Sequence, residues 1–206
     1  FRAPDAHPKF VSKLPKPAKI KPGATGSPLE NVHAPDRAGS RPGGKYGGGS
    51  GVSFPGPTLE ADKDVAADIR WHNDLPNSGL SMAEGHLLPV DTSLHMANPA
   101  LGIPTVVHLH GGHTESASDG QTEGWYTQGW NAFGPDHVKE IYHYDNDQEA
   151  ATLWYHDHAL GITRLNVYAG PAGFYLLRDD NERNLVANGV LPDPNSAFEH
   201  EIVIQD

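Results

Sequence analysis

The stretch LEADKDVAADIRW, residues 59–71, alternates apolar with polar side chains and decides the fold class. Apart from Lys63, its odd-numbered positions are apolar: Leu59, Ala61, Val65, Ala67, Ile69 and Trp71. The positions between them are mostly charged. Successive side chains of a β-strand point to opposite faces, so a period of two predicts β-structure with one buried face.

Five segments downstream are also predicted strands: residues 105–112, 138–145, 151–158, 173–179 and 200–206. Clusters of Gly, Pro, Asp and Asn, such as ASDGQTEG, separate them. One stretch, ALGITRLNVYAG, is expected to form a short helical turn, and no long amphipathic helix is predicted. Several short strands separated by turn-forming residues favour an all-β chain that folds as an antiparallel sandwich or barrel.

Residues 1–53 differ from the rest of the chain in composition. They are rich in Pro, Gly and Lys and show no sustained period of 2 or 3.6. This composition predicts a basic, extended N-terminal arm and linker in front of a folded domain at 54–206. Because the start FRAPDAHPKF lacks Met and an apolar signal core, we expect a chain that is processed at its N-terminus.

Charge is divided unevenly along the chain. Residues 1–50 hold nine Lys and Arg against three Asp and Glu, a net charge of +6, so the remaining residues carry −17 to give the total of −11. Phosphate binding needs clustered Lys and Arg, and the acidic domain therefore disfavours nucleic acid as a partner. No apolar run approaches the ~18 residues of a membrane span, so we expect a soluble chain without one.

Two histidine pairs lie in the predicted strands. His108 and His110 belong to VVHLHGG, and His156 and His158 belong to LWYHDHALG. Residues i and i+2 of a strand point to the same face about 6.6 Å apart, so each pair projects side by side. If the two strands are neighbours, four imidazoles line one patch and the residues inside each pair face the opposite way.

Such a patch is a candidate metal site. Imidazole clusters bind Cu, Zn, Fe or Ni. The chain has 13 histidines and no cysteine, which excludes thiolate ligands and disulfides. Gly111 and Gly112 lack side chains where a backbone would have to approach a metal or another domain closely, although an ordinary turn is the simpler interpretation of these two glycines alone. A metal site is therefore favoured over two unrelated pairs of half-buried histidines.

Two other functions remain open on these residues. HLHGGH contains the H-x-H-x-x-H spacing of zinc-dependent hydrolases similar to metallo-β-lactamases. That family has Asp where this chain has Gly112, and it has an alternating α/β pattern that this sequence lacks. His113 is left unassigned. The second alternative is a non-catalytic copper-binding module of the cupredoxin type.

Other residues near the pairs have structural interpretations. Trp71, Trp154 and Tyr155 are predicted to be core aromatics. Asp157 is expected to orient a neighbouring strand or to form an ion pair with Arg164.

Four strings resemble the first cupredoxin domain of a multicopper oxidase: FPGPTLEADKDVAADIRWHNDLP, LPVDTSLH, VVHLHGGHTESASDGQTEGW and LWYHDHALGITRLNVYAGPAGFYLLRD. They are most similar to the branch of this family that contains spore-coat laccase, bilirubin oxidase and phenoxazinone synthase. The resemblance implies a cupredoxin-like Greek-key β-sandwich or barrel over residues 54–206. The stretch NVHAPDRAGSRPGGKYGGGSG departs from the pattern, because that branch has strand-forming sequence before PGPT.

The resemblance also implies roles for single residues. His108 corresponds to a ligand of the type 2 copper and His110 to a ligand of one type 3 copper, while His156 and His158 correspond to ligands of the type 3 pair. Asp119 corresponds to an acid on the proton path to O₂. Reduction of O₂ to water consumes four protons, which a nearby carboxylate can relay. The simpler interpretation of Asp119 is a turn residue before Gly120.

A complete site of this kind needs groups that the chain lacks. A type 1 copper requires Cys and His, and the trinuclear cluster requires four more histidines from a third cupredoxin domain. We therefore expect half of a split site, completed by a second chain or a fragment cleaved near Asp206 that carries the other domains. The expected reactants are O₂ and a phenolic or similar reductant, and the family suggests an extracellular, cell-envelope or spore-coat location.

Overall fold

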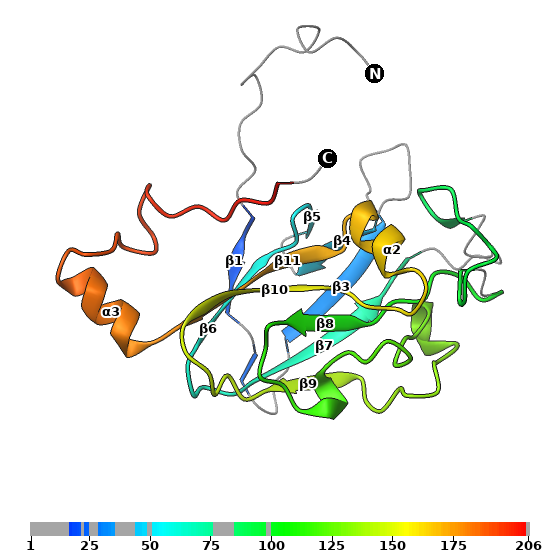
Figure 1. The fold of residues 1–206 in the computed structure, drawn as a ribbon, viewed down its shortest axis with the longest axis horizontal. Coiled ribbons are helices and arrows are strands. Elements are labelled where there is room, and N and C mark those ends of the chain that lie inside the picture. The colour runs from blue at the N-terminus through cyan, green and yellow to red at the C-terminus, as the bar shows by residue number, and fades with distance from the viewer. Residues whose placement is uncertain are drawn as a thin grey trace, which may run out of the picture.

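The computed structural model describes residues 17–21, 23–24, 29–35, 44–48, 51–75, 85–97 and 100–204. Within them the strands form two sheets that pack on a common core (Figure 1). The first sheet has the order β1 (Lys19–Ile20), β6 (Thr58–Asp62), β11 (Ala172–Arg178), β10 (Ala151–Asp157) and β8 (Val107–His110). The second has the order β2 (Gly23–Ala24), β7 (Ala67–Asn73), β3 (Leu29–Pro35), β4 (Gly44–Gly48) and β5 (Gly51–Ser53), with β9 (Ile141–Tyr144) also paired to β7.

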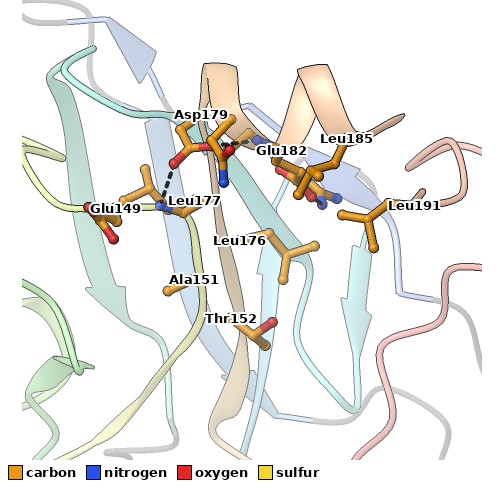
Figure 2. Close-up of a pocket in the computed structure, with 12 residues that line it drawn as sticks. Glu149, Ala151, Thr152, Leu176, Leu177, Asp179, Glu182, Leu185 and Leu191 are labelled. Atoms are coloured by element: carbon orange, nitrogen blue, oxygen red, sulfur yellow. Dashed lines mark hydrogen bonds and ion pairs between the residues drawn. The ribbon is translucent and has the colours of Figure 1, made fainter. Parts of the chain in front are cut away.

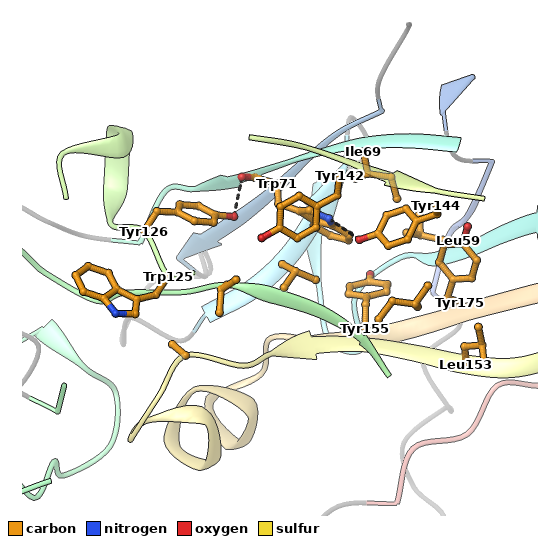
Figure 3. Packing of buried hydrophobic residues seen from close by; sticks show 14 of the residues in the cluster. Leu59, Ile69, Trp71, Trp125, Tyr126, Tyr142, Tyr144, Leu153, Tyr155 and Tyr175 are labelled. Carbon is orange, nitrogen blue, oxygen red and sulfur yellow. Dashed lines mark hydrogen bonds between the residues drawn. The ribbon is translucent and has the colours of Figure 1, made fainter. Parts of the chain in front are cut away.

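The core between the sheets contains a row of aromatic side chains (Figure 3). Trp71 of β7 packs on Tyr155 of β10 with ring centroids 5.1 Å apart, and Tyr144 of β9 lies 5.9 Å from Tyr175 of β11. The Trp71 indole donates a hydrogen bond to the Tyr144 hydroxyl, so its polar edge is satisfied inside the core. Burial of each large side chain stabilises the fold by about 1.5–3 kcal/mol.

The alternating stretch at 59–71 forms two strands instead of one. A turn at residues 63–66 separates β6 from β7, and Asp64 adopts a positive φ of 60° in it. The two strands belong to different sheets, and each turns its apolar face toward the same core. The alternation of buried and exposed residues is interrupted in the turn, where Val65 is 58% exposed, and Lys63 marks the point at which the chain changes sheets.

Both sheets are mixed, which corrects the antiparallel arrangement expected from the sequence. β6 runs parallel to β1 and to β11, and β3 runs parallel to β7, whereas the pairs β10–β11 and β8–β10 are antiparallel. The chain passes from one sheet to the other between β6 and β7. The parallel neighbours come from distant parts of the sequence, so no hairpin dictates their direction.

Parts of residues 1–53, predicted as an extended arm and linker, form strands that pair with other strands of the two sheets. β1 pairs with β6 through Lys19 and Ile20, and β3 pairs with β7 and β4. Strand-forming segments therefore precede PGPT, where the sequence departs from the family pattern. Strands of two residues, or Gly-rich ones such as β4, pair through their backbones and leave no periodic signal. The domain boundary at 53/54 stays a prediction.

The helices of the described part are short: η2 (Ser116–Ser118), η3 (Gln128–Trp130), α2 (Thr163–Ala169) and α3 (Asp180–Ala187). α2 confirms the predicted helical turn, while α3 was not predicted. Asp179 caps α3 by accepting a hydrogen bond from the Glu182 amide at 2.7 Å, and it also accepts one from the Ala150 amide (Figure 2). The pocket beneath α3 contains none of the predicted site residues.

The predicted strand at 200–206 is corrected as well. Residues 201–204 are described and have no regular secondary structure, and Ile204 is 95% exposed. Within the described residues no strand pairs with this segment. Apolar, β-branched composition is insufficient for a strand when no neighbouring backbone accepts its hydrogen bonds.

Candidate metal centre

The four predicted histidines converge at one edge of the first sheet. β8 and β10 are antiparallel neighbours with His108 opposite His156 in register (Figure 1). We refer to His108, His110, His156 and His158 as the histidine cluster. The five ring pairs in contact within it have centroid separations of 4.7–5.7 Å. The sequence-based expectation that the two strands are neighbours is confirmed.

The residues between the paired histidines face the core, as the alternation predicted. Leu109 is 3% exposed and belongs to the core cluster, and Asp157 is fully buried. One face of β8 and β10 therefore carries the imidazoles while the other holds the two sheets together.

Backbone carbonyls of the 119–120 turn orient two of the imidazoles. His108 Nδ1 lies 2.6 Å from the Asp119 carbonyl oxygen, and His158 Nδ1 lies 2.8 Å from that of Gly120. A carbonyl only accepts, so each Nδ1 carries the proton and each Nε2 keeps its lone pair. Such a partner on the second nitrogen fixes the ring orientation and tautomer of a metal-binding histidine.

Gly120 makes this arrangement possible. Its φ is +69°, and a Cβ atom at this position would lie 1.9 Å from the Val107 carbonyl oxygen. Only glycine lets the 119–120 turn approach β8 closely enough for both carbonyls to reach the imidazoles. At Gly111 and Gly112, by contrast, the atoms nearest to an added Cβ belong to the side chains of Leu153, Leu109 and Thr114.

The other two imidazoles point at each other. His110 Nδ1 lies 3.1 Å from His156 Nε2, while His156 Nδ1 lies 2.6 Å from the Asp157 carbonyl oxygen. His156 therefore presents an unprotonated Nε2 toward His110. Burial lowers the pKa of His156 to about 4, so this imidazole is neutral at pH 7. Neutral imidazole is the form that binds metals.

These residues fit one side of a copper shell. They are imidazole nitrogen donors, three of them oriented through Nδ1 by a backbone carbonyl, and imidazole suits copper or zinc. Among the described residues no group of three or more potential ligands converges to hold one ion. A metal bound here would take further ligands from elsewhere, as a split site requires.

Trp154 is part of the site, which corrects its prediction as a core residue. Its ring is 38% exposed and lies 4.2 Å from the His156 ring and 5.1 Å from that of His110. The core assignments of Tyr155 and Trp71 are confirmed, with exposures of 0% and 1%. The sequence contains the information needed to place Trp154 beside His156, because residues 154 and 156 share one face of a strand.

Asp119 lies beside the cluster at the end of η2. Its Oδ1 is 3.3 Å from His108 Nδ1, and its Oδ2 accepts a hydrogen bond from Gln121 Nε2 at 3.0 Å. The carboxylate is 29% exposed and so connects an imidazole of the cluster with solvent. This position suits a proton relay, and the role itself stays a prediction.

Two residues left open by the sequence now have partners. Asp157 accepts hydrogen bonds from the Val106 amide and from Asn166, and not from Arg164. The first of these bonds confirms its strand-orienting role. His113 is 75% exposed and lies 2.9 Å from Asp147 Oδ1, outside the cluster.

Comparison with known proteins finds similarity to one family. Residues 90–182 match the family model described as multicopper oxidase. A laccase of Bacillus stratosphericus is 47% identical over 134 residues, which cover 65% of this chain and 25% of that protein. A laccase of Bacillus subtilis (strain 168) is 39% identical over 188 residues, which cover 86% and 35%. The crystal structure of the McoA multicopper oxidase from Aquifex aeolicus superposes with a TM-score of 0.59 at 20% identity, covering 85% of this chain and 32% of that one.

These matches confirm the all-β, cupredoxin-like sandwich and exclude the zinc-hydrolase alternative, whose third ligand His113 also faces away. The chain spans about a quarter to a third of the length of the curated laccases it matches. Among its described residues, no helix has the length and apolar character needed to cross a membrane.

Proposed function

We propose that this chain, which is similar to laccases and to the multicopper oxidase family model, is the first cupredoxin-like domain of a copper-dependent oxidase that uses O₂ as electron acceptor. The observation that carries the proposal is the convergence of four imidazoles on β8 and β10. Three of them have an Nδ1 held by a backbone carbonyl, which leaves Nε2 free as a ligand.

The ligands divide between two types of copper in this proposal. His108 would hold the type 2 copper, while His110, His156 and His158 would hold the type 3 pair. The 3.1 Å approach of His110 Nδ1 to His156 Nε2 supports one shared ion for these two residues. When bound, the copper cluster supplies the four-electron reduction of O₂ to water.

The chain's own side chains orient ligands and move protons. Asp119 takes up protons from solvent at its carboxylate and passes them toward the cluster along the His108 side. Trp154 covers the rings of His110 and His156 and limits their rotation. The role of Asp119 depends on the turn at Gly120, which holds Asp119 against β8.

The rest of the oxidase lies outside this sequence in our proposal. A type 1 copper site with Cys and His, and four more histidines for the cluster, would come from a second chain, a cleaved fragment or a further part of a longer protein. A phenolic or similar reductant would donate electrons at that type 1 site. We propose an extracellular, cell-envelope or spore-coat location, in keeping with the laccase relatives.

Titration of the 206-residue chain with Cu²⁺, followed by electron paramagnetic resonance, tests the ligand assignment. We expect weak binding with imidazole nitrogen coupling, because an open half-shell holds a metal less tightly than a closed one. His108→Ala combined with His156→Ala should abolish this signal, whereas the matched His113→Ala should keep it. Unchanged nitrogen coupling in the double variant would overturn the assignment.

Oxygen consumption separates the oxidase from the non-catalytic copper-binding module. The chain assembled with the polypeptides that complete the site should consume O₂ when a phenol is added. Bound copper without oxygen uptake in that assembly would favour the binding module.

A further inference from the structure

A hydrogen-bonded network of polar side chains lies behind the histidine cluster. Its members are Asp157 at the end of β10, Asn166 on α2 and the half-buried His86. Asp157 is fully buried and Asn166 is 2% exposed. Polar groups at such depth are costly unless each is hydrogen-bonded, so their partners show what they hold in place.

Asp157 joins the two strands that carry the histidines. Its Oδ1 accepts a hydrogen bond from the Val106 amide at 3.0 Å, and its Oδ2 accepts one from the Ala159 amide at 3.2 Å. The ladder between β8 and β10 ends at the pair Val107–Asp157, where the chain turns away. The carboxylate therefore continues the connection between the two backbones beyond the last ladder pair. His158 is the next residue, and its own amide donates to the Val106 carbonyl at 2.8 Å, so the Asp157 carboxylate and this backbone bond together hold it against the segment before β8.

Asn166 fixes the orientation of that carboxylate. Its Nδ2 donates to Asp157 Oδ2 at 2.9 Å and to the Pro104 carbonyl at 3.0 Å, so both amide hydrogens are used. Its Oδ1 lies 3.1 Å from His86 Nε2. Because His86 Nδ1 accepts from the Leu88 amide at 3.0 Å, the proton is on Nε2, which donates to Asn166 Oδ1.

We propose that Asn166 and His86 are positioning residues for the copper ligands. They hold the Asp157 carboxylate between β8 and β10 and thereby set where His156 and His158 stand relative to His108. The inference rests on the proposed function, because it concerns the same ligands. Partners one step behind the ligands of metal sites typically change metal affinity by about 10–100-fold when they are removed.

Asn166→Leu in the 206-residue chain is the main test, since leucine is close in size and offers no hydrogen bond. The dissociation constant for Cu²⁺ should rise about 10-fold or more. In the metal-free chain, the imidazole ¹⁵N resonances of His156 and His158 should shift. His86→Leu should change both in the same direction, and His86→Gln, whose amide N–H can still donate to Asn166, should restore most of the affinity.

Leu177→Ala is the matched control, because it weakens the core at a buried site of the same sheet without touching the network. It should lower stability and leave the Cu²⁺ affinity and the two imidazole resonances unchanged. If Asn166→Leu does the same, its role is structural only and the inference is wrong.

The two proposals fail in different ways. If the unaltered chain binds no Cu²⁺ at the cluster, the proposed function fails, while the resonances of metal-free Asn166→Leu still decide the positioning role. If Asn166→Leu does not fold, the pair His86→Leu and His86→Gln decides it, and equal resonances in those two variants would overturn it.

Discussion

The histidine cluster and His143 place the same side chain in opposite environments. Imidazoles of the cluster face backbone carbonyls and one another. His143 on β9 lies between two carboxylates, with Nδ1 2.7 Å from Asp68 Oδ1 and Nε2 3.2 Å from Asp145 Oδ1. The hydrogen bond to Asp68 raises the pKa of His143, whereas burial lowers that of His156 to about 4.

The partners of each ring determine whether a histidine is suited to bind a metal or to carry a positive charge. Two carboxylates favour imidazolium, which has both nitrogens protonated and no lone pair for a metal. A carbonyl on one nitrogen, together with burial, favours neutral imidazole with a lone pair on the other. The count of 13 histidines in the sequence therefore says less about metal binding than the partners of each ring do.

Of the substitutions considered, Gly120→Ala should disturb the histidine cluster most strongly. The left-handed conformation costs alanine about 1–2 kcal/mol, and overlap with the Val107 carbonyl adds about 1–3 kcal/mol, so we expect a loss of about 3 kcal/mol in unfolding free energy. Urea unfolding measures this loss, and the Cu²⁺ affinity should fall as the 119–120 turn moves.

Gly189→Ala is the control for Gly120→Ala. Its φ is +70°, and nothing lies within 4 Å of an added Cβ, so only the conformational cost of about 1–2 kcal/mol applies. Equal losses of stability and affinity in the two variants would contradict the role assigned to the Gly120 contact.

Trp154→Ala should weaken Cu²⁺ binding at the histidine cluster by a smaller amount. Removing a stacked aromatic ring costs about 1 kcal/mol, which is about fivefold in the dissociation constant for Cu²⁺. Calorimetric titration measures the change. Trp154→Phe keeps a ring over His110 and His156 and should retain most of the affinity; an equal loss in both variants would argue against stacking.

His143→Gln should have the smallest effect, and that effect should depend on pH. Because the folded-state pKa of His143 is raised, its ion pair stabilises the chain fully below the unfolded value of about 6.5, and this contribution is lost as pH rises through the folded pKa. The unfolding free energies of the original chain and the variant should differ by less than about 1 kcal/mol in the lower range. They should converge at higher pH, and a difference that grows with pH would reverse the assigned sign.

Much of the site was predictable because it depends on local geometry. Alternation along β10 and β8 places His156 with His158, and His108 with His110, on single faces, and the same rule could have placed Trp154 beside them. The arm and the segment 200–206 were less predictable. Short or unpaired strands depend on which backbone lies next to them, and periodicity does not report this.

Side-chain chemistry and a period of two establish the β class, the two histidine pairs and the absence of a thiolate from the amino-acid sequence. Packing of the folded chain brings β8 against β10, where His110 and His156 are 46 residues apart in sequence, and it places Asn166 and His86 behind Asp157. Those contacts join distant segments, so they exist only after the sheets have packed and each buried polar group has found its partner.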